Sequence, residues 1–218
     1  MDVTVEAIKA ASQLLLPVII FGLLCLAFIL LNRHKASLSE TMAALGIKKV
    51  GFFGVTAEFV EQRLEAAASA DKTLLPVRDE DKPEIRKVTE RLGPLASGAR
   101  ILWFDYFPSY NLHERAAFTH LGIDVQTRRT KDVAMVELLD PKEEYHLVIS
   151  NWGQRVERQG PELLSEIRSK KLTIPFLFYT SSDRLEEKRI EASKLGAQGV
   201  TASPVQLYRW VLTWLALR

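Results

Sequence analysis

The sequence predicts an α/β domain with a five-stranded, doubly wound parallel sheet, preceded by one transmembrane helix and a small α+β connector. From residue 100 onward, short apolar runs alternate with helix-forming segments as in five successive β-α units. The runs ILWF, HLVIS and PFLFYT are almost wholly apolar, as strands buried on both faces of a parallel sheet must be. Near the N-terminus, residues 14–31 carry no charge.

The apolar segment near the N-terminus predicts a retained membrane anchor. A helix over residues 10–32 would span roughly 34 Å, enough to cross a bilayer core. Residues 1–9, a short non-cytoplasmic terminus, are net acidic, and no small-residue cleavage site follows the apolar run, which argues against a cleaved signal peptide. Basic residues at 33–35 place the C-terminal side in the cytoplasm. We therefore expect a single-pass protein of the bacterial inner membrane.

Residues 33–98 are predicted to form a juxtamembrane stalk and connector. The stalk covers 37–45. Glycines among aromatic and β-branched residues predict a short hairpin over 49–59. The next segment, 60–69, is rich in alanine and glutamate and favours a helix.

The second half of the connector is predicted to be a linker followed by a helix. Charged residues and prolines over 71–83 indicate the linker. A helix over 83–92 begins with proline, which is favoured at the first helical position. The Gly93-Pro94 pair then predicts a break before the main domain, which covers 99–218.

The main domain is predicted from its alternating pattern. The expected strands cover residues 101–104, 123–126, 146–150, 175–179 and 199–201. The expected helices cover residues 111–121, 131–139, 161–169, 183–195 and 205–217. Because ligands of such sheets bind at the carboxyl ends of the strands, four polar side chains are expected at one edge, namely Asp105, Asn151, Thr180 and Ser203.

Composition excludes several classes of function. A net charge of +2 over 218 residues argues against a dedicated nucleic-acid binder. The only cysteine, Cys25, lies in the apolar run, which excludes a disulfide within the chain and a cysteine metal cluster. The four histidines lack the spacing of a zinc hydrolase helix. The sequence thus predicts no metal site, no cofactor and no enzymatic activity.

Five motifs in order resemble the receiver domain of bacterial response regulators, a flavodoxin-like fold, over residues 100–218. They read ILWFDY, YHLVISNWG, GPELLSEIR, PFLFYTSS and LGAQGVTASP. In that family, two acidic residues after the first strand and an aspartate after the third hold magnesium, and this third-strand aspartate accepts a phosphoryl group. A Ser/Thr after the fourth strand and a lysine after the fifth bind the phosphoryl oxygens. The matching positions here are Asp105 and Tyr106, Asn151, Thr180 with Ser181 beside it, and Ser203.

The departures from this pattern imply a receiver-like domain that cannot be phosphorylated. The amide of Asn151 is a poor nucleophile and cannot form an acyl phosphate. Asp105 beside Tyr106 offers one carboxylate where magnesium prefers several hard oxygen ligands. Ser203 lacks the positive charge that a lysine would supply.

Two interpretations of the remaining side chains stay open. They form a polar pocket, together with Trp152, that binds a small molecule or holds the domain in one state. Alternatively, Asp105, Asn151 and the Thr180-Ser181 pair serve only as turn and helix-capping residues. Trp152 itself either covers the pocket, faces a partner or packs in the core.

The last helix carries a second apolar stripe that includes Trp210 and Trp214. This stripe predicts an oligomer face, with a broad buried face as the alternative. The function expected from the sequence is a membrane-anchored, non-phosphorylatable signalling module that acts through a protein partner or self-association. One alternative is a ligand-sensing membrane effector, for example in phage defence. Another is a TIR-like NAD-cleaving enzyme with Glu157 as its glutamate.

Overall fold

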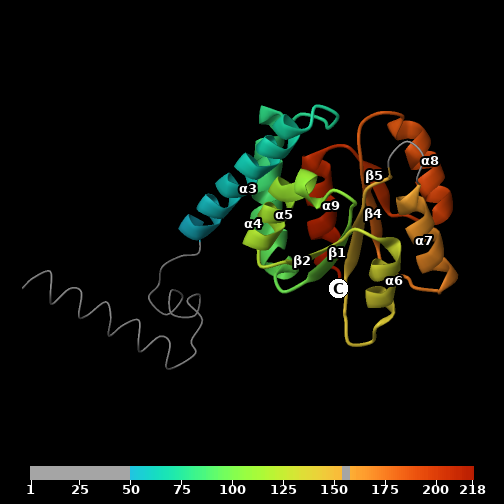
Figure 1. Cartoon of the computed structure of the whole chain (residues 1–218). Coiled ribbons are helices and arrows are strands. Elements are labelled where there is room, and N and C mark those ends of the chain that lie inside the picture. Colours follow the sequence, from blue (N-terminus) through green and yellow to red (C-terminus); the bar gives the residue numbers. More distant parts are fainter. Residues whose placement is uncertain (1–49, 154–157) are drawn as a thin grey trace, which may run out of the picture. The chain divides into compact units, whose positions relative to one another are not determined.

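The computed structural model describes residues 50–153 and 158–218, with side chains from residue 55 (Figure 1). The predicted transmembrane helix at 10–32, the predicted stalk at 37–45 and Glu157 lie outside the described residues. Within the described ranges, no helix is both long enough and apolar enough to cross a bilayer.

The centre of the structure is a five-stranded sheet whose neighbouring strands are all parallel. The strands are β1 (Arg100–Phe104), β2 (Asp124–Arg128), β3 (Leu147–Ser150), β4 (Phe176–Tyr179) and β5 (Gly199–Thr201). Their order is β2-β1-β3-β4-β5. This is the flavodoxin-like order, in which the direction of winding changes between β1 and β3. The predicted fold class of the main domain is therefore confirmed.

Helices cover both faces of the sheet (Figure 1). On one face lie α5 (Leu112–His120), preceded by the short helix η2 (Pro108–Asn111), and α9 (Pro204–Leu215). On the other lie α6 (Lys131–Leu139), α7 (Gln159–Ser169) and α8 (Leu185–Leu195). Strand side chains alternate between the two cores: Trp103 belongs to the α5/α9 side, and Leu102 and Phe104 belong to the opposite side.

The hairpin predicted over 49–59 is wrong for the part that the structure describes. Residues Val50–Ala70 form one helix, α3. Ala57, Val60, Leu64 and Ala67 are buried at intervals of three and four residues, which is the spacing of one helix face. This buried stripe crosses the boundary drawn at residue 60. From residue 50 to residue 98 the connector consists of helices joined by a loop and contains no strand, so the predicted α+β character is wrong for this part.

The predicted break at Gly93-Pro94 is also wrong. Helix α4 (Lys82–Ala96) follows the one-turn helix η1 (Asp79–Asp81) and has a proline in its first turn, as expected. It continues through Pro94 to Ala96, which is fully buried. A proline this close to the helix end removes only one late backbone hydrogen bond, and burial of Ala96 favours completing the turn.

The described part of the connector packs on the sheet domain, and residues 52–218 form one compact unit. Helix α4 lies against α9. Thr89 Oγ1 and Tyr208 Oη are 2.8 Å apart, and Arg209 Nη1 lies 2.8 Å from Glu84 Oε1. Tyr208 and Leu212, which lie outside the predicted stripe of Trp210 and Trp214, are both buried.

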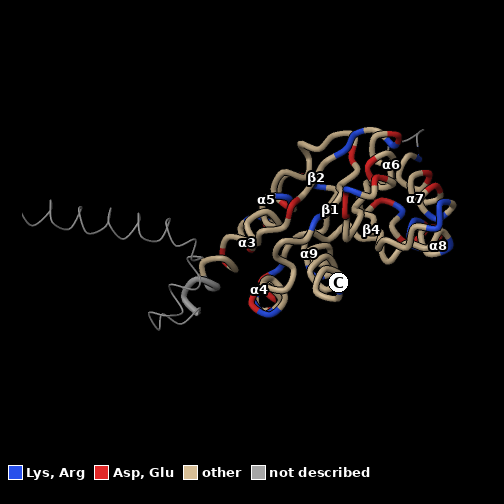
Figure 2. The backbone as a smooth tube through the Cα atoms, turned by 90° about the horizontal axis from the view of Figure 1, so that it is seen from below, with Lys and Arg blue, Asp and Glu red and all other residues tan. Residues whose placement is uncertain are grey.

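Charged residues of both signs interleave along α4, α7 and α8, whereas α9 is almost free of charge (Figure 2). This distribution fits the near-neutral net charge. Trp210 and Trp214 are half-buried and pack against the core on the α5/α9 side. Self-association through these two tryptophans stays a prediction.

Candidate functional site

The four polar side chains expected at one edge of the sheet do follow the carboxyl ends of their strands. Asp105 comes directly after β1, Asn151 after β3 and Thr180 after β4. Ser203 comes two residues after β5, at the start of α9. These loops form the candidate site, and its side chains are held by hydrogen bonds within the chain.

Asp105 is the centre of this network and is only 4% exposed. Its Oδ1 accepts a hydrogen bond of 2.8 Å from the Phe107 backbone N–H. Its Oδ2 accepts from Asn111 Nδ2 at 2.9 Å and from Asn151 Nδ2 at 3.4 Å. Both carboxylate oxygens therefore serve to fix the loop after β1 and to join it to the loop after β3.

Hydrogen bonds at both the nitrogen and the oxygen of its side-chain amide fix the orientation of Asn151. Its Nδ2 donates to Asp105, and its Oδ1 accepts from the Gly153 N–H at 3.1 Å. Gly153 has a φ of +112°, a conformation that favours glycine. Helix α7 begins so close by that a Cβ on Gly160 would lie 2.1 Å from the Asn151 carbonyl oxygen. An aspartate at 151 could not donate this bond to Asp105 unless it were protonated.

The two aromatic neighbours of these residues have different surroundings. Tyr106 is 58% exposed and lies edge-on to Phe107, with ring centroids 4.8 Å apart. Trp152 is 8% exposed and packs on Phe178, also with centroids 4.8 Å apart. Trp152 is thus a core residue on the α6–α8 side, in agreement with one of the three interpretations drawn from sequence.

A lysine that the sequence analysis missed lies beside the Thr180-Ser181 pair. Lys188 Nζ, on α8, is 3.3 Å from Thr180 Oγ1 and 3.2 Å from Ser181 Oγ. Partial burial lowers the pKa of this lysine. In the sequence it belongs to the charged run LEEKR, which resembles any solvated helix face. The fold therefore places a positive charge here from α8 instead of from the loop after β5.

Ser203 acts as the N-cap of α9. Its Oγ accepts a hydrogen bond of 3.2 Å from the Gln206 N–H, and its own N–H donates to Thr201 Oγ1 at 2.9 Å. Pro204 occupies the first helical position, where no N–H is needed. This side chain stabilises the helix start and does not supply the charge of a lysine.

A loop of the connector reaches the same edge of the sheet. The Ser182 N–H donates to the Thr73 carbonyl oxygen at 2.8 Å, and the Leu75 N–H donates to the Ala202 carbonyl oxygen at 2.9 Å. Residues predicted to be a free linker are thus joined to the loops that hold Thr180 and Ser203.

A buried acid lies next to this loop and was also missed. Glu114 on α5 is 1% exposed, and its Oε1 accepts a hydrogen bond of 2.7 Å from Tyr179 Oη. Its Oε2 is buried without a partner among the described residues. Burial raises the pKa of Glu114, and the nearby Asp71 raises it further, against the effect of the Tyr179 hydrogen bond. A single glutamate in a polar helix segment gave no signal of burial.

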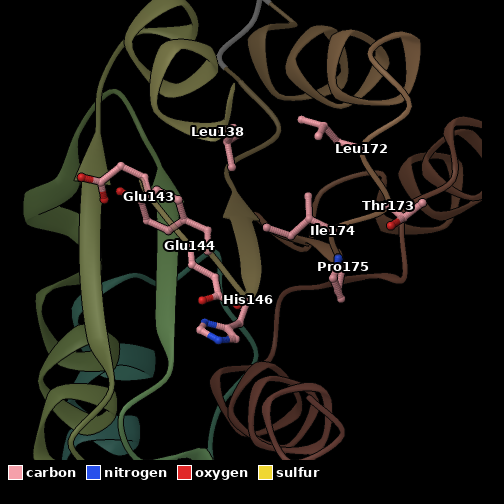
Figure 3. Close-up of a pocket in the computed structure, with 9 residues that line it drawn as sticks. Leu138, Glu143, Glu144, His146, Leu172, Thr173, Ile174 and Pro175 are labelled. Atoms are coloured by element: carbon pink, nitrogen blue, oxygen red, sulfur yellow. The ribbon is translucent and has the colours of Figure 1, made fainter. Parts of the chain in front are cut away.

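The arrangement offers little to a metal ion. Over residues 50–153 and 158–218, no group of three or more histidine, cysteine, aspartate or glutamate side chains could hold one. A cavity of about 380 Å³ lies instead at the opposite, amino-terminal edge of β3 and β4 (Figure 3). Its lining includes Leu138, His146, Leu172 and Ile174, and none of the predicted site residues is among them.

Comparisons with known proteins give no family. No protein-family model and no curated protein matches the sequence. Among solved structures, the chain is similar to the receiver domain of the Francisella response regulator 1452, with 17% identity and a TM-score of 0.47, over 56% of this chain and 98% of that one. It is also similar to the chemotaxis response regulator CheY4 of Vibrio cholerae, with 21% identity and a TM-score of 0.42, over 52% and 98%. A receiver domain from Clostridium thermocellum gives 19% and 0.47, over 55% and 95%. The fold itself is established by the parallel sheet and its strand order.

Proposed function

We propose that this chain is a signalling module with a receiver-like fold that does not accept a phosphoryl group and acts through contacts with proteins. We further propose that the segment at 10–32 anchors it in the bacterial inner membrane, with the sheet domain in the cytoplasm. The observation that carries the first proposal is the network in which Asp105 binds Phe107, Asn111 and Asn151.

The chemistry of this network supports a site without phosphoryl transfer. The side chain that faces Asp105 from the loop after β3 is an amide that donates a hydrogen bond, where an acyl phosphate would need a carboxylate. The neighbouring Tyr106 supplies no oxygen anion for magnesium. Ser203 caps α9, and Lys188 contacts neutral oxygens of Thr180 and Ser181.

The protein contacts of this module would be made by the loops and helices around the candidate site. Tyr106, Phe107, Tyr110 and Leu112 are exposed in and after the loop that follows β1. Exposed aromatic side chains grouped in this way are enriched at protein interfaces. This aromatic group supports a protein partner more directly than a soluble substrate.

Beryllofluoride, a mimic of the phosphoryl group, tests the proposal. Fluorine NMR of the full-length protein in detergent, with magnesium and beryllofluoride, should show only the signals of the free species. A bound signal that disappears in Asn151→Ala or Asp105→Asn would contradict the proposal. A response-regulator receiver domain under the same conditions provides the positive control.

A further inference from the structure

We propose that residues 71–78, called the strap below, regulate the candidate site by holding the β4–α8 and β5–α9 loops together. The strap joins α3 to η1. When the strap is seated, the two loops are tied together through its backbone, and when it is released they become free to move separately. The proposal deepens the function proposed above, because it names the segment that controls the loops of the same site.

The strap contacts two different loops through its backbone. Thr73 accepts a hydrogen bond from Ser182 in the β4–α8 loop, and Leu75 donates one to Ala202 in the β5–α9 loop. The Leu74 N–H also donates to the Asp71 carbonyl oxygen at 3.0 Å, so Thr73 lies in a turn and Leu75 follows it. The strap thus bridges the two loops through one acceptor and one donor of its own backbone.

The strap lies next to the polar residues of the candidate site. Ser182 follows the Thr180-Ser181 pair, and Ala202 precedes Ser203. The Thr180 N–H donates to the carbonyl oxygen of Thr201, the last residue of β5, at 3.0 Å, so the two loops begin side by side. A change in the strap therefore reaches both loops.

Two partly buried side chains and a few backbone hydrogen bonds hold the strap on the domain. The side chains of Leu74 and Val77 pack against the core on the α5/α9 side, whereas Leu75 is 42% exposed. At one end of the strap, Asp71 Oδ1 accepts a hydrogen bond of 2.8 Å from the Thr73 N–H. At the other end, Asp81 Oδ2 accepts a hydrogen bond of 2.8 Å from the Arg78 N–H. Both ends are therefore held by residues in the strap or next to it. Segments with so few buried contacts open at a lower free energy than the whole domain.

Helix α3 connects the strap to the part of the chain on its N-terminal side. Its side chains contact the domain through a stacked Phe59–His120 pair, with centroids 4.2 Å apart, and an ion pair of 2.6 Å between Glu61 and Arg86. The strap begins directly after this helix, and the Asp71 N–H donates to the Ala67 carbonyl oxygen. Movement of α3 from its N-terminal side would therefore pull on the strap.

Hydrogen exchange of the full-length protein in detergent, read by mass spectrometry, tests the strap. Leu74→Ser removes an apolar contact with the core, and the matched control Leu75→Ser changes a side chain that is exposed. In Leu74→Ser, peptides covering 73–78, 180–186 and 202–206 should exchange about tenfold faster, a factor that corresponds to about 1.4 kcal/mol and fits the loss of a partly buried leucine contact. Peptides of β1 and β3 should not change, and Leu75→Ser should match the wild type.

A second pair of variants covers the case in which Leu74→Ser loosens the whole domain. Leu75→Pro removes the N–H that binds Ala202 and leaves Leu74 in place, and Leu75→Ala keeps that N–H. Faster exchange at 180–186 in Leu75→Pro but not in Leu75→Ala supports the proposal. Faster exchange that is confined to residues 73–78 in both Leu74→Ser and Leu75→Pro overturns the proposal. Binding of beryllofluoride would contradict the proposed function and would leave these results unaffected.

Discussion

At the scale of single residues, the contact between Asn151 and Asp105 decides what the site can do. Asn151→Asp would place a second carboxylate against Asp105, where the amide now donates at 3.4 Å. We expect the variant to be less stable at neutral pH by about 1–3 kcal/mol, from the lost hydrogen bond and the repulsion. Thermal unfolding followed by circular dichroism measures the change.

The pH dependence of this loss of stability distinguishes repulsion between the two carboxylates from a change in packing. Repulsion raises the pKa of one of the two carboxyl groups in the folded variant, so stability is kept at acid pH and lost as the pH rises through that pKa. Asn151→Ala lacks the new charge, so its deficit should stay constant as the pH rises through that raised pKa. Equal pH profiles for the two variants would show that the carboxylates do not face each other.

Burial raises the pKa of Glu114, and this leads to a separate prediction of how stability depends on pH. A folded-state pKa above the unfolded value means that the stabilising contribution is present at acid pH and lost as the pH rises through the folded-state value. Glu114→Gln still accepts the Tyr179 hydrogen bond and cannot ionise. The melting temperature of Glu114→Gln relative to the wild type should therefore increase from acid to alkaline pH.

Tyr179→Phe provides the matched control for Glu114. The hydrogen bond from Tyr179 lowers the pKa of Glu114, so its removal should move the pH-dependent loss of stability to higher pH. Equal pH dependence of the melting temperature in the wild type and Glu114→Gln would show that folding does not raise the pKa of Glu114.

Part of the candidate site follows from the sequence, and part depends on packing. Asp105, Asn151 and Thr180 could be placed at one edge because each follows an apolar strand, and parallel strands bring such positions together. Lys188 and Glu114 could not be found, because only the assembled helices determine which charged side chains are half-buried or buried. The contact of Thr73 with Ser182 joins distant residues through backbone atoms, which carry no sequence signal.

At the scale of elements, the strands and helices after residue 100 were predictable and the connector was not. Strands buried on both faces are continuous apolar runs, and this signal does not depend on neighbours. In α3, the small residues Ala57 and Ala67 form half of the buried stripe. Because alanine is only weakly apolar, the helical periodicity of apolar residues is hard to recognise in this part of the sequence. In α4, Pro94 is tolerated because the helix end packs against the domain.

The contact of α9 with β5 gives a prediction at this scale. A Cβ on Gly199 would lie 2.5 Å from Trp210 Cζ3, so Gly199→Ala should cost roughly 1–3 kcal/mol through overpacking. Trp210→Ala removes the clashing ring, and Gly199→Ala should then cost much less. Chemical denaturation of the four proteins in this double-mutant cycle measures the coupling.

Trp214→Ala serves as the control in the same cycle, because the atoms nearest to a Cβ at position 199 all belong to Trp210. Gly199→Ala should cost the same with or without Trp214. Additive effects of Gly199→Ala and Trp210→Ala would show that α9 does not lie on β5 in this way.

At the scale of the whole molecule, the anchor proposed at 10–32 determines where the domain works. An uncharged segment of this length should keep the full-length protein in the membrane fraction during extraction with alkaline carbonate or high salt. A variant with two arginines in the middle of the segment should lose this retention. Release of the unchanged protein by carbonate would contradict the anchor.

The central claim is that the candidate site does not accept a phosphoryl group, and intact mass spectrometry after incubation with acetyl phosphate and magnesium tests it most directly. The wild type should keep its mass. Asn151→Asp alone should react poorly, because Tyr106 and Ser203 still replace a magnesium ligand and a lysine, and the triple variant Tyr106→Asp, Asn151→Asp, Ser203→Lys should gain reactivity. A wild-type protein that gains the mass of one phosphoryl group, and loses this gain in Asp105→Asn or Asn151→Ala, would contradict the account.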